Sequence, residues 1–182
     1  MPGKSDVAPK NQQLPHKIMK QLLASLALVT LFTSYAHAQD ATDIKASAER
    51  GKATYMMTCL ACHQITGQGL PGTFPPFDGS EYVQGDPKRL VAIVIKGLTG
   101  PITVKGTKFP GVIPLIAVDT QFPQLKDNAK LADVLNFIRT SWSNKADVAI
   151  TPDFIQKVRD EFKDRTTPWT EEEVLKAFPA AK

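Results

Sequence analysis

The chain has 182 residues, of which 42% are hydrophobic, 22% are charged and 8% are aromatic. This length and composition predict one folded domain with its own core, and no internal repeat or low-complexity tract argues otherwise. The 22 basic and 18 acidic residues give a formal net charge of +4. A balance this close to neutral does not indicate a nucleic-acid partner or a strongly charged partner of any kind.

The N-terminal segment has the pattern of a secretory leader. Lys17 and Lys20 precede an apolar run over residues 22–32, and a small-x-small sequence ends at Ala38. A charged segment, a short hydrophobic stretch and such a cleavage site together predict a signal peptide over residues 1–38. The apolar run is too short to span a bilayer, which needs ~20 residues.

Cleavage after Ala38 would leave a mature chain with 18 basic and 17 acidic residues, because four lysines and one aspartate lie in the leader. Residues 1–18 are more polar than the start of an ordinary leader, and translation from Met19 would give a leader of usual length. We expect a protein that is periplasmic or otherwise exported, soluble after cleavage and without a membrane span.

The most informative stretch is Cys59-Leu60-Ala61-Cys62-His63. Two cysteines three positions apart, followed directly by histidine, form the attachment signature of a c-type haem. On one helical turn both sulfurs can form thioethers with the two vinyl groups of a single porphyrin, and the next imidazole can ligate the iron. We therefore predict one covalently attached haem c, held by Cys59 and Cys62, with His63 as an axial ligand of the iron.

A redox cysteine pair and half of a zinc site are the alternatives for this motif. A zinc site would need two more ligands, and residues 39–182 contain no other cysteine or histidine. A redox Cys-x-x-Cys pair would follow a strand in a βαβ unit, and no such pattern is visible here.

The mature chain has mostly helical spacing, and its caps place several helix starts. Asp86 and Pro87 predict one start, and Thr170 with Glu173 predicts another as a capping box. On the first helix Gly51 lies four residues before Tyr55, either because another helix approaches closely or as a tolerated surface glycine. The predicted helices cover about residues 44–58, 87–97, 127–142, 152–162 and 170–178, with loop over 64–86 and a small hairpin over 101–109.

With these features the chain resembles the class I cytochrome c family over about residues 44–143. Gly51 and Tyr55 match the glycine and the aromatic residue of the family's N-terminal helix. Val134 and Phe137 match their partners on the C-terminal helix. The resemblance implies an all-α class I cytochrome c fold, with three core helices around a covalent haem and a small β-hairpin-like insertion.

Beyond the region of resemblance the tail also has helical spacing, and its apolar stripes either pack on the haem domain or form a docking surface. We expect the cytochrome domain over residues 39–149 and a C-terminal helical extension packed on it over residues 150–182. The resemblance also implies a proline contact. One of Pro75 or Pro76 would be the proline whose carbonyl accepts the other ring N–H of His63, a bond that orients the ligand.

The second axial position departs from the family pattern. The related loops read Gly-Val-Met-Pro and supply a methionine to the iron, whereas this chain has Ile113 there. Met56 and Met57 lie on the attachment side and cannot reach the opposite face. The other candidate distal ligands are Lys105, Lys108 and Tyr82, and our first expectation is a five-coordinate or water-bound iron beneath an apolar lid that includes Ile113.

Residues 100–114 and 137–144 are similar, more specifically, to cytochromes associated with quinoprotein dehydrogenases and copper nitrite reductases. This resemblance implies electron transfer to or from a periplasmic oxidoreductase, with a quinoprotein dehydrogenase as one candidate partner, and no catalysis by the chain alone. The alternative is a five-coordinate haem that binds NO or CO as a sensor or scavenger. A peroxidase would need a distal acid–base group, for which only Arg89 and Arg139 stand out; a purely structural haem is a further alternative.

Overall fold

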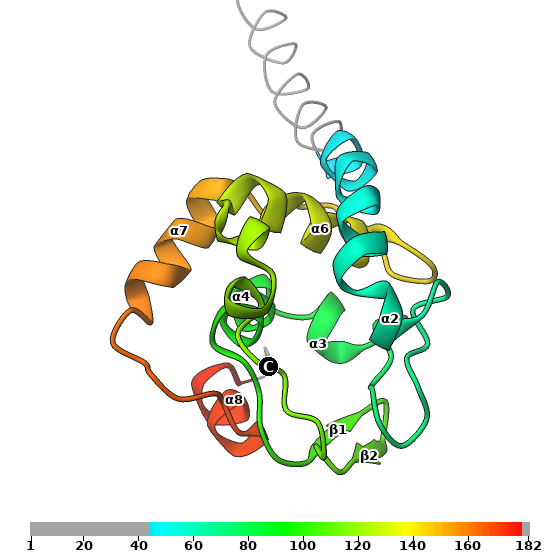
Figure 1. Cartoon of the computed structure of the whole chain (residues 1–182), viewed down its shortest axis with the longest axis vertical. Coiled ribbons are helices and arrows are strands. Elements are labelled where there is room, and N and C mark those ends of the chain that lie inside the picture. Colours follow the sequence, from blue (N-terminus) through cyan, green and yellow to red (C-terminus); the bar gives the residue numbers. More distant parts are fainter. Residues whose placement is uncertain (1–43, 180–182) are drawn as a thin grey trace, which may run out of the picture. The chain divides into compact units, whose positions relative to one another are not determined.

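Helices form most of the computed structural model, which describes residues 44–179 (Figure 1). The predicted signal peptide, residues 1–38, lies outside the described residues. The first helix covers residues 44–58 and leads into α2. The elements that follow are α2 (Leu60–His63), α3 (Glu81–Gln84), α4 (Pro87–Lys96), β1 (Ile102–Val104), β2 (Thr107–Phe109), α5 (Val118–Gln121), the 3-10 helix η1 (Pro123–Lys126), α6 (Asn128–Thr140), α7 (Pro152–Glu161) and α8 (Glu171–Ala177).

Side-chain caps set the starts of the helices as the sequence predicted. The Asp86 carboxylate accepts a hydrogen bond from the Lys88 N–H, and Pro87 occupies the first turn of α4. Thr170 and Glu173 form a capping box at the start of α8. α4 ends at Lys96, and the Gly97 that follows has a φ of +86°, in the left-handed region that glycine adopts without strain.

The first helix crosses α6 at a point where neither backbone leaves room for a side chain. A Cβ atom on Gly51 would lie 2.0 Å from the carbonyl oxygen of Asp133. One turn further along, the ring of Tyr55 lies 5.2 Å from the ring of Phe137. The predicted close approach at Gly51 is therefore confirmed, and the alternative of a surface glycine is wrong.

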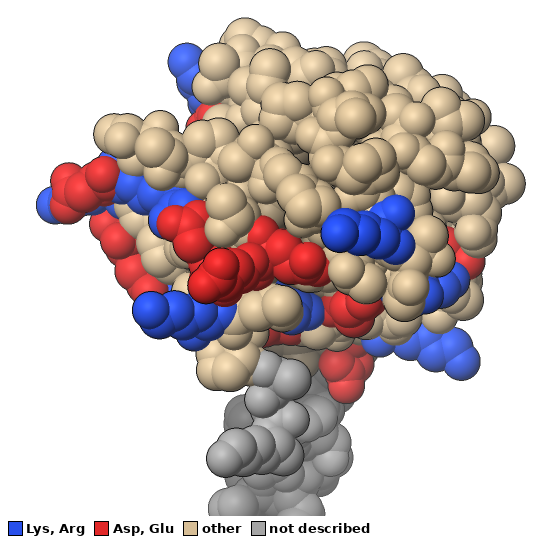
Figure 2. All heavy atoms as spheres, turned by 90° about the horizontal axis from the view of Figure 1, so that it is seen from below, with Lys and Arg blue, Asp and Glu red and all other residues tan. Residues whose placement is uncertain are grey.

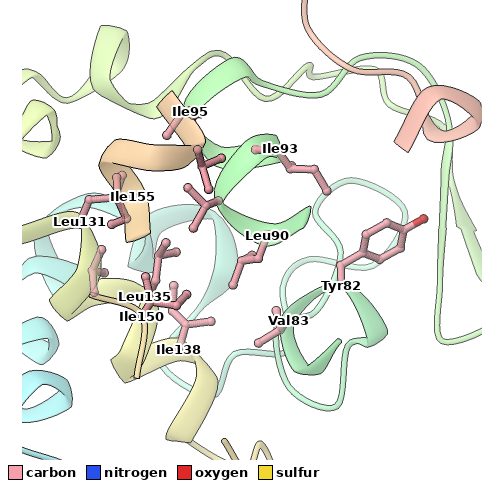
Figure 3. Packing of buried hydrophobic residues seen from close by; sticks show 14 of the residues in the cluster. Tyr82, Val83, Leu90, Ile93, Ile95, Leu131, Leu135, Ile138, Ile150 and Ile155 are labelled. Carbon is pink, nitrogen blue, oxygen red and sulfur yellow. The ribbon is translucent and has the colours of Figure 1, made fainter. Parts of the chain in front are cut away.

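One apolar core joins α4, α6 and α7 (Figure 3). Leu90 of α4 and Leu135 of α6 are buried in it, and α7 contributes Ile155 and Val158, both almost fully buried. α7 packs against α4 and α6, so the C-terminal residues close one side of this core (Figure 1).

Three features differ from the sequence prediction. The expected loop over residues 64–86 contains the short helix α3, and two more short helices, α5 and η1, precede α6. The helix predicted to reach Trp142 ends at Thr140, because Ser141 is extended and Trp142 has a φ of +56°. The Trp142 ring still packs against the core, and it lies 5.6 Å from the ring of Tyr55.

The small hairpin was predicted correctly. β1 and β2 are antiparallel, with Ile102 opposite Phe109, and Lys105 and Gly106 form the turn.

No helix within residues 44–179 is long and apolar enough to cross a membrane.

Candidate haem site

The two cysteines and the histidine of the motif lie on one helical turn. The 44–58 helix continues through Cys59, whose N–H donates to the Tyr55 carbonyl (2.9 Å). The His63 N–H in turn donates to the Cys59 carbonyl (2.9 Å). Continuous helical hydrogen bonding thus places both thiols and the imidazole along a single turn, as attachment to one porphyrin requires.

The thiols of Cys59 and Cys62 are free and partly buried. Burial raises the pKa of Cys59 to about 11, an increase that the nearby Thr58 hydroxyl only partly opposes. A redox-active Cys-x-x-Cys pair needs the opposite, a lowered thiol pKa. The environment of Cys59 therefore argues against the redox-pair alternative.

The His63 ring is held in the tautomer that a metal ligand needs. Its Nδ1 atom lies 3.0 Å from the carbonyl oxygen of Pro75, and because a carbonyl can only accept, Nδ1 carries the proton. The sequence did not decide which proline carbonyl accepts this bond, and the structure shows that it is Pro75 and not Pro76. Burial lowers the pKa of His63 to about 4, so the imidazole is neutral at pH 7, with Nε2 unprotonated.

Aromatic rings from the loop after the motif fix the position of the imidazole. The Phe77 ring stacks on His63 with centroids 3.7 Å apart and an interplanar angle of 14°. Phe74 lies 6.1 Å from the same ring. These two residues, which flank the two prolines, limit rotation of the ligand and exclude water from one side of it.

Glycines allow the loop to fold back onto the motif. The Gly69 N–H donates to the His63 carbonyl (3.1 Å), and a Cβ atom at Gly69 would lie 2.2 Å from the Phe74 carbonyl oxygen. Gly67 has a φ of +69°, and a Cβ there would meet the Trp142 ring at 2.6 Å. Both positions therefore require glycine.

Two residues that sequence reasoning missed tie this loop to the end of α6. Asp78 accepts from the Ser143 N–H (2.9 Å) and from the Ser143 hydroxyl, and these bonds lower the pKa of its carboxyl group. Asn144 is buried; it accepts from the Gly79 N–H (2.8 Å) and donates to the carbonyls of Phe77 and Ile138. Partners 65 to 67 positions away leave no local sequence signal.

Ile113 lies in residues 110–117, which we call the distal loop. The loop is held at both ends: a Cβ on Gly111 would lie 1.9 Å from the Gly100 carbonyl oxygen, and Leu115 pairs with Leu98. Between these points the side chains of Val112 and Ile113 are 69% and 53% exposed. An aliphatic side chain offers no atom that could ligate iron.

The structure gives other partners to most of the groups considered for the distal side. The Lys105 ammonium group donates to the Asp78 carbonyl (3.2 Å), and the Tyr82 hydroxyl donates to Glu171 (3.2 Å). Lys108 is exposed on β2. Met56 and Met57 are exposed on the helix before the motif.

The two arginines considered for acid–base chemistry are engaged with backbone carbonyls. Arg89 donates to the Glu81 carbonyl and lies over the Tyr82 ring, and Arg139 donates to the Val148 carbonyl (2.8 Å). Neither contact includes a residue of the Cys59–His63 motif.

The donor set of this site fits a haem c. Two protonated thiols on one turn can add across the two vinyl groups, and a neutral imidazole with its Nδ1 proton bonded to a carbonyl presents Nε2 to an iron atom. Within residues 44–179 no group of three or more Cys, His, Asp or Glu side chains could hold a bare metal ion. These features together define a c-type haem protein.

Comparison with known proteins agrees with the geometry. Residues 48–142, just over half of the chain, match the family model described as Cytochrome c, and the chain belongs to this family. Its fold is the class I cytochrome c fold, with about half of the described residues in helices and one small two-stranded antiparallel sheet. Proteins of this family carry covalently attached haem c and act as electron carriers or as cytochrome subunits rather than as catalysts.

Three relatives illustrate the range of proteins to which the chain is similar. It is 37% identical over 122 residues to cytochrome c-552 of Thermus thermophilus, covering 63% of this chain and 78% of the relative. It is 32% identical over 155 residues to the gluconate 2-dehydrogenase cytochrome c subunit of Pantoea cypripedii, covering 82% of this chain and 32% of the relative.

The third relative is the cytochrome c subunit of alcohol dehydrogenase (quinone) from Gluconacetobacter polyoxogenes, 32% identical over 114 residues. That match covers 60% of this chain but 22% of the relative. The chain therefore spans about a third or less of the dehydrogenase subunits that it resembles, and most of the length of the single cytochrome.

Proposed function

We propose that the chain is an exported monohaem cytochrome that transfers electrons to or from a periplasmic oxidoreductase. Cys59 and Cys62 hold the haem through thioether bonds and His63 ligates the iron. We infer that Ile113 occupies the position of the distal methionine in the family pattern. The observation that carries this proposal is the His63 ring, on the same turn as both thiols and fixed through Nδ1 by Pro75 at 3.0 Å.

The bound haem supplies one-electron redox chemistry at its iron. The protein's residues supply orientation and environment. Pro75 holds the imidazole tautomer, Phe77 fixes the ring plane, and Asp78 and Asn144 anchor the loop that carries both. Because His/Met ligation raises the potential, a site with Ile113 should have a lower potential than one with methionine.

The proposed partner is an exported dehydrogenase, and a quinoprotein dehydrogenase is the first candidate. The support is the similarity to cytochrome subunits of alcohol and gluconate dehydrogenases, which covers only part of their length. On the face shown in Figure 2, acidic and basic side chains are interspersed along one part and a broad area carries neither. That face offers a protein partner an uncharged area and offers nucleic acid no continuous basic patch.

Binding of a small ligand such as NO or CO is the second candidate function. It is favoured by the apolar residue at position 113 and by the partners that Lys105 and Tyr82 already have. A haem iron with an open position binds such ligands, whereas a closed six-coordinate iron resists them.

The attachment can be tested on the purified holoprotein by extraction with acidified organic solvent. Thioether-bound haem stays with the polypeptide, so the native chain and a Met57→Ala control should retain all of it. A Cys59→Ala, Cys62→Ala double variant should release any haem that it binds. Complete release from the native chain would overturn the proposed attachment.

A rapid-mixing experiment distinguishes the two candidate functions. Electron transfer predicts fast reduction of the ferric protein by a reduced quinoprotein dehydrogenase. The ligand-binding function predicts slow reduction but tight binding of NO to the ferrous protein.

A further inference from the structure

Residues 169–171, which we call the C-terminal strap, comprise the end of the connection from α7 and the first residue of α8, and Trp169 pairs with the chain that follows α4. The Thr99 N–H donates to the Trp169 carbonyl (2.8 Å), and the Trp169 N–H donates to the Gly97 carbonyl (3.0 Å). Leu98 thereby forms a parallel bridge with Trp169.

The opposite edge of the same segment holds the distal loop. The Leu98 N–H donates to the Leu115 carbonyl, and the Leu115 N–H donates to the Leu98 carbonyl, both at 2.9 Å. Leu98 is therefore the middle of a three-segment pairing, with Leu115 on one side and Trp169 on the other. An isolated pair of short segments is marginal in water, and a third segment is what makes such pairing stable.

The side chains of Trp169 and Glu171 hold the strap against α4 and β1. The Trp169 indole N–H donates to the Ala92 carbonyl of α4 (3.1 Å), and the side chain is 4% exposed. Its ring packs edge-on against Phe162 (5.2 Å) and Phe178 (5.8 Å). A carboxylate oxygen of Glu171 accepts from the Thr103 N–H of β1 at 2.6 Å.

The distal loop has little packing of its own. Val112, Ile113 and Ile116 are each more than half exposed, and of the loop's large aliphatic side chains Leu115 is the one that packs against the core. The position of the loop depends on the Leu98–Leu115 pair and on the close contact of Gly111 with Gly100. Both anchors lie on the segment that the strap holds from the other side.

We propose that Trp169 and Glu171 are positioning residues for the distal loop, and that the C-terminal strap thereby limits access to the distal face of the haem. The second part rests on the proposed function, which places Ile113 on that face. Loosening the strap should let the Leu98–Leu115 pair open more often, so that a small ligand reaches the iron faster.

Two measurements on the holoprotein test this proposal. Hydrogen exchange reports the opening of the distal loop, and flash-photolysis rebinding of CO to the ferrous protein reports access to the iron. The variants are Trp169→Phe, which removes the bond to Ala92 and keeps an aromatic ring, and Glu171→Ala. The controls are Glu171→Gln, which keeps an oxygen for the Thr103 N–H, and Glu172→Ala on the same helix turn.

We expect about tenfold faster exchange of the Leu98 and Leu115 amides in the two test variants, because their hydrogen bonds join the distal loop to this segment. Residues 131–138 of α6 should be unchanged, and CO association should be several-fold faster. Exchange of the Leu98 and Leu115 amides that stays at the native rate would overturn the positioning role. Uniformly faster exchange throughout the chain would also overturn it, because the strap would then stabilise the whole fold and not the distal loop in particular. Faster local exchange with unchanged CO binding would overturn instead the placement of Ile113 over the iron.

Discussion

The backbones of Gly51 and Asp133 touch where the first helix crosses α6. A Cβ atom on Gly51 would lie 2.0 Å from the Asp133 carbonyl oxygen, and no side-chain rotation can relieve a clash with backbone. The crossing also aligns Tyr55 with Phe137, whose rings lie 5.2 Å apart. This contact therefore fixes the orientation of the first helix, and with it the position of the Cys59–His63 motif at its C-terminal end.

Gly51→Ala tests the importance of that crossing. Overpacking at a rigid contact should lower the free energy of unfolding by about 2–3 kcal/mol, because the two helices must move apart. Lys52→Ala, at an exposed position on the same helix, is the matched control and should change stability by less than about 0.5 kcal/mol. Urea unfolding of the holoprotein measures both; equal stability of the two variants would contradict the close crossing.

Asn144→Ala should loosen the loop that carries Pro75 and Phe77. The change leaves the Gly79 N–H and the carbonyls of Phe77 and Ile138 without this partner in a buried site. Buried groups that lose their partners cost about 1–3 kcal/mol, so we expect a loss of about 2–3 kcal/mol. Lys145→Ala, whose side chain is exposed, serves as the control, and chemical unfolding compares the two.

A loss in Asn144→Ala no larger than in this control would mean that the loop is held by its aromatic packing instead. The resonance Raman frequency of the iron–histidine stretch gives a second measurement. It should shift in Asn144→Ala if the loop orients His63.

Asp78→Asn should change how stability depends on pH. The bonds from Ser143 hold the pKa of Asp78 below its usual value of 3.8, so the folded state favours the carboxylate. That contribution is present above pH 4 and is lost as the pH falls through the lowered pKa. At pH 7 the variant should be less stable by no more than about 1 kcal/mol, because the carboxylate lies close to solvent.

The measurement for Asp78→Asn is the free energy of unfolding in urea at intervals from pH 6 to pH 3. The native chain should lose stability more steeply than the variant below pH 4. Asp164→Asn is the control, since its exposed side chain makes no hydrogen bond in the part of the chain that the structure describes. Parallel pH curves for the native chain and the Asp78 variant would show that the Ser143 bonds do not favour the carboxylate.

Ile113→Met should restore the distal ligand if the loop faces the iron. We expect a low-spin, six-coordinate spectrum with a methionine–iron band and a higher reduction potential. Val112→Met is the matched control, because its side chain is more exposed and adjacent in the same loop. The same low-spin spectrum in both variants would show that the loop does not favour residue 113 over residue 112 as a ligand of the iron. A high-spin Ile113→Met protein would show that the loop lies away from the iron.

Local patterns in the sequence predicted the parts of the fold that depend on near neighbours. The haem motif follows from spacing within one turn, and the helix starts at Pro87 and Glu171 follow from caps one to three residues away. Gly51 was singled out by its helical position, but only the structure shows that Asp133 makes glycine necessary.

The site could be predicted only in part, because several of its contacts join distant segments. Pro75 and Pro76 are equivalent in sequence, and the folding of the loop around Gly69 decides which carbonyl faces His63. The pairing of Leu98 with Leu115 and Trp169 involves single residues and therefore has no strand-like pattern. The four-residue helices α3 and α5 are too short to show a helical period.

The ligand set of the iron is the central claim, and the optical and resonance Raman spectra of the ferrous holoprotein with and without CO test it most directly. His63 as the single protein ligand, with Ile113 on the opposite face, predicts a five-coordinate, high-spin ferrous haem that binds CO readily. A six-coordinate, low-spin haem that resists CO would contradict the account, because another side chain would then close the distal position.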